Sequence, residues 1–398
     1  MHCSIHDLRI FRTERFPFAR PVLRINSAAG RSQAASTWEG GTMNRRNVFR
    51  LSALACTASL LIAYGPSAVA VNDEPLTGKW APSEWGPNDK AGSANRRTAA
   101  SVLKAMKLVK KGKVATLGKV YQQDAPGFGS RGWRMTIPGL PTGGPFGKQE
   151  LVYNDEYVAT EIGQIGTQFD GPGHIGVITS KGMFYYNGRF LHDKEISAYG
   201  LGPLGVEHVG QLGFVCRGVV LDAVALRGGK QLPIPVKNSA DDPGVITDKD
   251  VQAMVKRQGI APIGEGDCVF LHTGHGDIWH PTQWDTFDAA EKQRRIALFN
   301  SGEPGFGVSA CEYLASRKIA LTGGDTWGVD AVGPGFGGEG EQPFECHIKL
   351  QTKRGIWNLE NLDLNQLVAD KAYEFLFAWS PLKIKGATGS PGNPIAIY

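Results

Sequence analysis

Short apolar runs alternate with segments of helical spacing along most of the chain, and this alternation constrains the fold more than any other feature. Residues 219–224 and 268–271 are apolar runs of the kind that form buried strands. Between them, Thr247 and Asp250 have the spacing of a capping box, and Gly259 marks the end of the helix that would follow. Strands that alternate with helices are typical of α/β proteins. The sequence therefore predicts a mixed sheet core with flanking helices.

The same reasoning predicts further elements on both sides of this region. Residues 98–107 have helical spacing, and Ser309 with Glu312 repeats the capping pattern ahead of another helix. Four other runs are apolar or aromatic enough for strands: residues 114–121, 319–321, 373–379 and 395–398. No low-complexity linker divides residues 71–398, so we expect a single domain there.

The region before this domain has the features of an export signal. The pair Arg45-Arg46 lies in a basic stretch, and an uncharged run follows over residues 51–64. The sequence Ala68-Val69-Ala70 then matches the small-x-small site that signal peptidase cleaves. Fourteen apolar residues are too few to span a bilayer core, which needs about twenty. A cleaved signal is therefore favoured over a membrane anchor.

We expect residues 43–70 to be a twin-arginine-type signal peptide and the product to be periplasmic or otherwise exported. Residues 1–42 precede a second methionine, Met43, and lack obvious periodicity. We interpret them as a non-structural upstream extension.

The charge of the chain excludes some classes of partner. The first 70 residues hold nine arginines, no lysine and three acidic residues, so removing them leaves 34 basic and 35 acidic side chains of the 43 and 38 in the whole chain. This balance provides no electrostatic surface for nucleic acid or for an acidic membrane. We expect a small-molecule substrate, no nucleic acid and no membrane anchoring after cleavage.

Four cysteines lie in residues 71–398: Cys216, Cys268, Cys311 and Cys346. Their wide spacing shows neither the paired cysteines of a zinc site nor the density of a disulfide scaffold. We expect buried free thiols, with one bridge in an oxidising compartment as the alternative.

The densest polar signal lies between Gln164 and His174. An extended chain sends every second side chain to the same side, so Gln164, Gln168 and Asp170 would converge on one face. A carboxylate with neighbouring amide oxygens can hold a divalent cation, and the imidazole of His174 can act as a base or a further ligand. The alternative is purely structural, with Asp170 forming an Asx-turn before Gly171-Pro172.

The motif also resembles that of a known family. Gln164 to His174 reads Gln-x-Gly-Thr-Gln-x-Asp-x-Pro-x-His, which resembles the signature His-x-Gly-Thr-His-x-Asp-x-Pro-x-His of the metal-dependent cyclase family, including bacterial kynurenine formamidase and isatin hydrolase. Later segments are similar in the same order. They are Gly307-Val308-Ser309, Asp325-Thr326, His347, Glu360-Asn361-Leu362 and the closing stretch from Ser380-Pro381 to Pro394-Ile395-Ala396.

This resemblance implies a swivelling β/β/α fold, a homodimer, and hydrolysis of amide or imide-like bonds with bound Zn²⁺ or Mn²⁺. By position, Asp170 would be a metal ligand and His174 the acid/base residue, while His347 and Glu360 would complete or support the metal site. Gln164 and Gln168 stand where the family has two histidine ligands.

Three outcomes are open at these two glutamine positions. Amide oxygens of Gln164 and Gln168 could serve as weaker, harder ligands, which would favour Mn²⁺ or Mg²⁺ over Zn²⁺. Alternatively, His272 and His275, beyond the apolar run at 268–271, could replace the lost imidazoles. In the third case no metal binds, and the remaining side chains act as general acids and bases.

The sequence therefore predicts an exported hydrolase that cleaves an amide, imide, lactone or ester-like bond with metal-activated water. Tryptophans at 279, 284, 327 and 357 favour an aryl or ring-shaped ligand. A serine hydrolase is a weaker alternative, because the elbow-like Gly307-Val308-Ser309-Ala310-Cys311 lacks the second glycine. The alternative from another class is a non-catalytic small-molecule-binding protein with a degenerate metal site.

Overall fold

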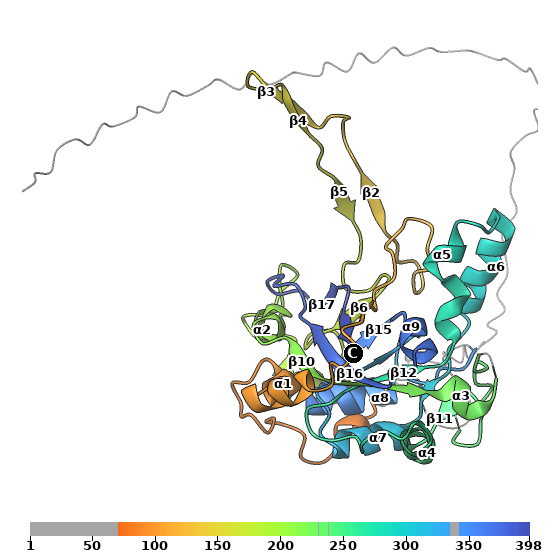
Figure 1. Ribbon diagram of the computed structural model, residues 1–398. Coiled ribbons are helices and arrows are strands. Elements are labelled where there is room, and N and C mark those ends of the chain that lie inside the picture. Colours follow the sequence, from red (N-terminus) through yellow and green to blue (C-terminus); the bar gives the residue numbers. More distant parts are fainter. Residues whose placement is uncertain (1–70, 230, 238, 335–341) are drawn as a thin grey trace, which may run out of the picture. The chain divides into compact units, whose positions relative to one another are not determined.

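We describe the protein from a computed structural model, which defines residues 71–229, 231–237, 239–334 and 342–398 (Figure 1). The expected upstream extension at 1–42 and signal peptide at 43–70 lie outside these residues. The chain divides into two units, Met1–Ser67 and Ala68–Tyr398, and the second is the domain described below. Among the described residues, no helix is both long and apolar enough to cross a membrane.

A mixed nine-stranded sheet forms the centre of the domain (Figure 1). Four neighbouring strands, β10, β12, β14 and β15, run parallel, and antiparallel strands extend the sheet at both sides. In spatial order the strands are β1 (Val114–Thr116), β18 (Ile395–Ile397), β16 (Glu374–Trp379), β10 (Phe214–Asp222), β12 (Cys268–His272), β14 (Leu321–Gly324), β15 (Trp357–Glu360), β6 (Gln168–Asp170) and β17 (Gly389–Pro391). This arrangement confirms the predicted mixed sheet with flanking helices.

Alternate residues of the parallel strands pack into two different apolar clusters. Val220 and Phe270 belong to the cluster on one face, whereas Val219 and Val269 belong to the cluster on the other. Because side chains alternate across a strand, both faces of these strands are buried, which explains their continuous apolar sequence. The second cluster also contains side chains of α4 (Asp248–Gln258) and α7 (Val308–Ser316), so these helices cover that face.

The remaining helices are mostly short. They are α1 (Ala99–Met106), α2 (Glu207–Gly210), α3 (Ala223–Arg227), α5 (Pro281–Trp284), α6 (Ala289–Phe299), α8 (Glu345–His347) and α9 (Asn365–Ala369), with a single π-helical turn, Ile348–Thr352, directly after α8. Smaller sheets pair β7 (Val177–Thr179), β8 (Gly182–Tyr185) and β9 (Arg189–Phe190), and β11 (Val245–Ile246) with β13 (Gly305–Phe306).

The helix-capping predictions succeed at α4 and fail at α7. Thr247 and Asp250 form the predicted capping box, and Gly259 ends α4 in the left-handed conformation with φ of 64°. By contrast, α7 begins at Val308, two residues before the start that a Ser309 cap would give, and its N-cap residue, Gly307, provides no side-chain cap. The Ser309 hydroxyl instead accepts a hydrogen bond of 3.2 Å from the backbone N–H of Asp248, at the start of α4.

The expectation of free thiols is wrong. Cys216 is bonded to Cys268 and Cys311 to Cys346, across sequence separations of 52 and 35 residues. The first bridge joins the neighbouring strands β10 and β12, and the second joins α7 to α8. Wide spacing in the sequence did not indicate these pairs because the sheet and its crossovers bring distant segments together.

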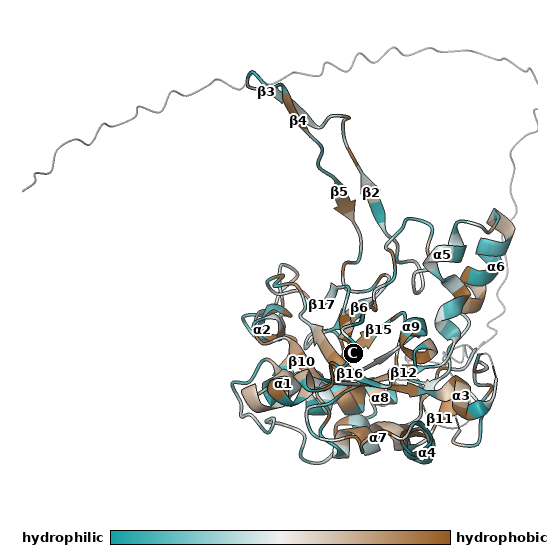
Figure 2. Ribbon diagram, viewed as in Figure 1, coloured by the Kyte–Doolittle hydropathy of each residue, from teal (hydrophilic) through white to brown (hydrophobic). Residues whose placement is uncertain are grey.

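Two strand pairs, β2 (Arg134–Thr136) with β5 (Tyr157–Ala159) and β3 (Gly143–Phe146) with β4 (Leu151–Tyr153), form a long arm that extends from the domain (Figure 1). Figure 2 shows hydrophobic stretches on β4 and β5 of this arm. Its apolar side chains are exposed, with Leu140 at 80% and Tyr157 at 66%. The arm therefore carries apolar surface that the described chain does not cover.

Candidate active site

Strand pairing and one helix bring three potential metal ligands together. Strand β6 lies between β15 and β17, and in the antiparallel β6–β15 pair Gln168 is opposite Glu360. Asp170 ends β6, Glu360 ends β15, and His347 ends α8. Residues separated by up to 190 positions in the sequence thus meet beside the end of the central sheet.

Asp170, His347 and Glu360 form a compact, buried group. Nε2 of His347 lies 3.3 Å from Oε1 of Glu360 and 3.6 Å from Oδ2 of Asp170. One potential ligand atom from each residue lies within 4.8 Å of the others, and the side chains are 1–4% exposed. This spacing is short enough for one metal ion to contact all three.

Asp330 sets the orientation of His347. Its Oδ2 accepts a hydrogen bond from Nδ1 of His347, and its Oδ1 accepts one of 2.7 Å from the backbone N–H of Cys346. With Nδ1 occupied, Nε2 is directed at the two carboxylates. Burial opposes protonation of His347, but the adjacent carboxylates outweigh it and raise the pKa of His347 well above its usual value.

The pKa values of the two carboxylates in the group are shifted in opposite directions. Burial and the nearby charge of Asp170 raise the pKa of Glu360 to about 7. Burial also opposes ionisation of Asp170, yet its interactions with His174 and His347 lower the pKa of Asp170. Ionising both carboxylates is therefore costly without a neighbouring positive charge.

Glu303 adds a further buried acid that the sequence did not indicate. One of its oxygens accepts a 2.7 Å hydrogen bond from the backbone N–H of Trp327, while Oε1 has no hydrogen-bond partner among the described residues. Burial and the charge of Glu360 raise the pKa of Glu303 well above its usual value. Glu303 and Asp330 carry no local signal because each lies alone in an otherwise apolar or glycine-containing segment.

Gln164 and Gln168 both face this group, although Gln164 precedes β6 in a turn rather than extending the strand. The amide nitrogen of Gln164 donates a 2.8 Å hydrogen bond to Oδ1 of Asp170. The amide nitrogen of Gln168 donates a 2.7 Å hydrogen bond to Oε2 of Glu360. The amide nitrogens of Gln164 and Gln168 thus donate hydrogen bonds to the carboxylate oxygens. Rotation of the two terminal amides would instead turn their carbonyl oxygens towards the group.

His174 lies at the edge of the buried group. Its Nε2 is 3.5 Å from Oδ2 of Asp170, and its Nδ1 is 3.3 Å from the amide nitrogen of Gln164. The side chain is 21% exposed, in contrast to the three residues of the group. Burial, together with the charges of His347 and Arg131, lowers the pKa of His174 despite the opposing effect of Asp170. The ring is therefore neutral near pH 7 and can accept a proton.

His272 and His275 have other surroundings. Nδ1 of His272 lies 3.2 Å from Oδ1 of Asp222. His275 is completely buried, stacks on Phe299 with ring centroids 6.2 Å apart, and has no hydrogen-bond partner for either nitrogen among the described residues. Neither residue belongs to the group of potential ligands found in the described part of the chain.

Comparison with known proteins identifies the family. A family model described as "Putative cyclase" matches residues 104–331, more than half of the chain. The chain belongs to this cyclase family. The matched segment contains Gln164 to His174, whereas His347 and Glu360 follow it in the sequence.

One solved structure supports the cyclase fold, and two others show a weaker similarity. A crystal structure of a novel cyclase is 26% identical with a TM-score of 0.63, over 79% of this chain and 98% of that one. An isatin hydrolase bound to the product analogue thioisatinate is 21% identical, with a TM-score of 0.49 over 76% and 99% of the two chains. Isatin hydrolase A from Ralstonia solanacearum is 22% identical, with a TM-score of 0.48 over 75% and 97%. Comparison with curated protein sequences finds no match.

In this cyclase, aromatic side chains line one side of the candidate metal-binding group formed by Asp170, His347 and Glu360. Phe344 lies edge-on to His347 with ring centroids 5.4 Å apart, and Trp327 lies 6.1 Å from Phe344. Phe128 stacks on Trp327 at 4.5 Å, and the guanidinium of Arg131 lies over Phe128. Arg131 also borders a cavity of about 570 Å³ between residues 123–131 and α6. The rings of Phe128, Trp327 and Phe344 therefore form an aromatic wall beside the site, and the guanidinium of Arg131 lies next to this wall.

Proposed function

We propose that this cyclase is a metal-dependent hydrolase that cleaves an amide, imide, lactone or ester-like bond of a small molecule. The observation that carries the proposal is the buried group of Asp170, His347 and Glu360, with ligand atoms within 4.8 Å of one another. Two carboxylates buried so close together are unfavourable unless a cation or a shared proton compensates their charge. A divalent ion at this position would supply that compensation.

The charge around the group also fits a metal ion. Glu303 and Asp330 are buried beside it, so four acidic side chains lie close together at this site. Two carboxylate oxygens with one imidazole nitrogen suit Mn²⁺ and also admit Zn²⁺. We propose Mn²⁺, because rotation of the Gln164 and Gln168 amides would add further oxygen ligands rather than nitrogen or sulfur.

Within this proposal the ion, when bound, activates a water molecule and polarises the substrate carbonyl. His174 accepts the proton of the attacking water as the water oxygen bonds to the carbonyl carbon. The C–N or C–O bond then breaks, and His174 returns the proton to the leaving nitrogen or oxygen. Asp170 holds the His174 ring in position through its contact of 3.5 Å with Nε2, and Nδ1 is the nitrogen that takes up the proton once the Gln164 amide rotates away from it.

The aromatic wall supports a ring-shaped substrate. Trp327 and Phe344 offer flat apolar surface next to His347, and aromatic groups prefer such surfaces. Arg131 is close enough to lower the pKa of His174, so it can also orient a carbonyl or carboxylate group of the substrate. We propose an aryl amide, imide, lactone or ester as the substrate class.

The test combines a substrate panel with metal exchange. Purified protein is assayed with N-formyl anilides, isatin-like imides, lactones and aryl esters, before and after chelation and after addition of Mn²⁺ or Zn²⁺. Chelation should abolish hydrolysis and Mn²⁺ should restore it, while elemental analysis of gently purified protein should find a stoichiometric metal. Hydrolysis that survives complete metal removal would contradict the metal-dependent reaction.

The alternative is a non-catalytic binding protein that kept the fold. It is favoured by the two glutamines at positions where the family resemblance places histidines. This alternative predicts stoichiometric binding of panel compounds without turnover under any metal condition, which calorimetry and product analysis distinguish from catalysis.

We further propose that the protein is a homodimer. The exposed apolar side chains of the arm support this, since exposed apolar patches commonly mark protein–protein interaction sites. Light scattering after size exclusion should give twice the monomer mass. Replacing Leu140 and Tyr157 with serine should shift the protein towards monomer, and a wild-type monomer would contradict the proposal.

We also propose that the protein is exported and that the mature chain begins at residue 71. The two disulfides support it, because such bonds persist in oxidising compartments. Mass spectrometry of the exported protein should find Val71 at or near its start, and a product retaining residues 51–64 would contradict cleavage.

A further inference from the structure

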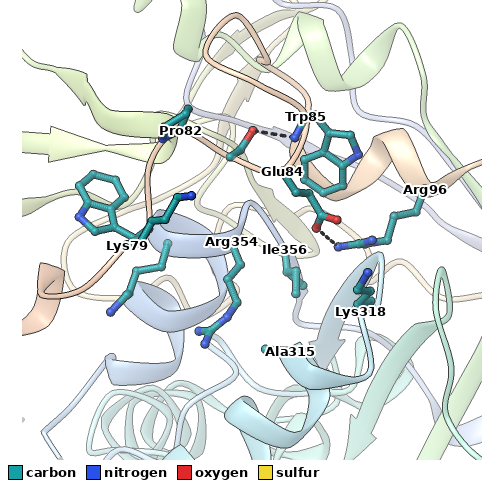
Figure 3. A pocket seen from close by; sticks show the side chains of 12 residues that line it. Lys79, Pro82, Glu84, Trp85, Arg96, Ala315, Lys318, Arg354 and Ile356 are labelled. Atoms are coloured by element: carbon teal, nitrogen blue, oxygen red, sulfur yellow. Dashed lines mark hydrogen bonds and ion pairs between the residues drawn. The ribbon is translucent and has the colours of Figure 1, made fainter.

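A cavity of about 540 Å³ lies where β14 and β15 begin. Three segments line it: residues 79–96, the turn after α7 at 315–318, and residues 353–356 just before β15. Figure 3 shows side chains of these segments around a shared space. Ile356 precedes β15 and Glu360 ends it, which corresponds to roughly 13 Å at about 3.3 Å per residue. The cavity is therefore separate from the metal-binding group.

Positive charge dominates the walls of this cavity. Lysine and arginine side chains outnumber the single acidic residue, Glu84; the cations are Lys79, Arg96, Lys318, Lys353 and Arg354. Arg96 is committed to ion pairs with Glu84 and Glu265, and Arg354 pairs with Glu312. For Lys79, Lys318 and Lys353, the described part of the chain offers no carboxylate within ion-pair distance. Three ammonium groups are thus available to a ligand.

Lys353 lies in an unfavourable environment for a cation. Burial, followed by the charges of Lys349 and Arg354, lowers the pKa of Lys353, and Glu312 compensates only in part. Its ammonium group has one hydrogen bond, of 3.3 Å, to the backbone carbonyl of Thr77. An anion in the cavity would relieve the repulsion between these neighbouring cations.

Part of the cavity wall is apolar and firmly held. Trp85 lies beneath the guanidinium of Arg96, which is 4.9 Å from the ring centroid, and Trp80 also lines the cavity. Ile356 and Ala315 add buried aliphatic side chains to the lining. The Arg96 side chain is only 6% exposed, so its ion pairs hold this wall in place. Such a wall can contact the apolar part of a ligand whose charged group binds the nearby lysines.

We infer that this cavity binds a small organic anion that carries at least two negative charges on a flat apolar body. Lys79, Lys318 and Lys353 would bind the charges, and a tryptophan ring of the lining would cover the apolar body. Aryl dicarboxylates and aryl phosphates share this chemistry. The inference does not depend on the proposed hydrolase activity, because no cavity residue belongs to the metal-binding group.

Isothermal titration calorimetry of the full chain tests this inference. The probes are phthalate and phenyl phosphate, which separate the carboxylate source from the phosphate source of charge. Succinate serves as the control with charge but no ring, and benzamide as the control with a ring but little charge. At low ionic strength we expect one phthalate or phenyl phosphate per chain, weaker binding of succinate, and no binding of benzamide. Affinity should fall as salt is added.

Variants of two lysines that line the cavity test where the probes bind. Lys318→Gln and Lys353→Gln remove cations that have no acidic partner, so each should weaken probe binding about tenfold by removing a charge-assisted hydrogen bond. Lys249→Gln removes an exposed lysine on α4 and serves as the matched control, with affinity unchanged. A midpoint of thermal unfolding like that of the wild type shows that each variant is folded.

The titration is repeated after chelation and with Glu360→Gln, since an anion could also bind a metal in the active site. Cavity binding should survive both changes. Binding lost with Glu360→Gln but retained in the two lysine variants would place the anion at the metal site and overturn the inference. Equal binding of benzamide, or no binding of either probe at millimolar concentration, would overturn it as well.

Discussion

Gln168 and Glu360 are opposite each other in the β6–β15 pair, and the amide nitrogen of Gln168 donates a 2.7 Å hydrogen bond to Oε2 of Glu360. A similar hydrogen bond, of 2.8 Å, runs from the amide nitrogen of Gln164 to Oδ1 of Asp170. Each glutamine therefore occupies one carboxylate oxygen that would otherwise be free to bind a metal. We therefore expect residues 164 and 168 to control the metal affinity of the site.

The double variant Gln164→His/Gln168→His should bind Zn²⁺ more tightly than the wild type. Imidazoles at these positions would replace neutral amide donors with nitrogen ligands that zinc prefers. Elemental analysis and competition with a zinc chelator measure the change. Gln252→His, on the exposed face of α4, is the control and should leave zinc affinity unaltered. Equal zinc affinity in the double variant and the control would show that residues 164 and 168 do not reach the ion.

Asp330→Asn should weaken metal binding by about 10–100-fold while leaving the three proposed ligands in place. The carboxylate of Asp330 accepts a hydrogen bond from Nδ1 of His347, so a neutral amide at position 330 would orient the ring less firmly. Metal titration measures the loss. Asp285→Asn, at an exposed position, should have no effect. Unchanged affinity in Asp330→Asn would mean that His347 does not need this contact.

His174→Ala should reduce the rate of hydrolysis by about 10²–10⁴-fold, as expected for loss of a positioned general base. Because His174 lies at the edge of the metal-binding group, metal content should remain near the wild-type value. Turnover and elemental analysis are measured on the same sample, with His192→Ala as an exposed control. Near-normal turnover in His174→Ala would remove this residue from the proposed reaction.

His275 should make the domain less stable in acid. Burial, with a contribution from Lys119, lowers the pKa of His275 to about 3, whereas an unfolded histidine titrates near 6.5. Below pH 6.5 the unfolded chain therefore takes up a proton that the folded protein excludes. This one group should lower the free energy of unfolding by about 1.4 kcal/mol per pH unit as the pH falls from 6.5 towards 3.

Urea unfolding at several pH values measures this dependence. His275→Leu should have a shallower loss of stability between pH 6 and pH 4 than the wild type. His192→Leu, at an exposed position, should follow the wild type. Parallel curves for all three proteins would show that His275 is accessible to protons in the folded state.

The two disulfides should contribute differently to the metal site. Loss of either bridge, by Cys311→Ser/Cys346→Ser or Cys216→Ser/Cys268→Ser, should lower the free energy of unfolding by about 2–4 kcal/mol. Only the first pair adjoins a proposed ligand, because Cys346 precedes His347. Metal affinity should therefore fall in the first variant and remain in the second. Equal metal affinity in both would show that the bridge does not support His347.

Several elements could be predicted from the sequence because their determinants are local. Thr247, Asp250 and Gly259 interact within the helix that they begin and end, so their spacing predicts α4 directly. The apolar run at 268–271 corresponds to β12 because a strand buried on both faces needs apolar residues throughout. At α7 the same local rule failed, since Ser309 binds the start of another helix rather than its own.

The surroundings of the candidate site required the tertiary structure. The motif from Gln164 to His174 identified one part of it, and family resemblance pointed to His347 and Glu360. Glu303 and Asp330 had no sequence signal, because their importance comes from burial beside residues that lie far away in the chain. The two disulfides were missed for the same reason. Local sequence determines which segments form helices and strands, whereas the order of strands in the sheet determines which charges are buried together and therefore what the site can bind.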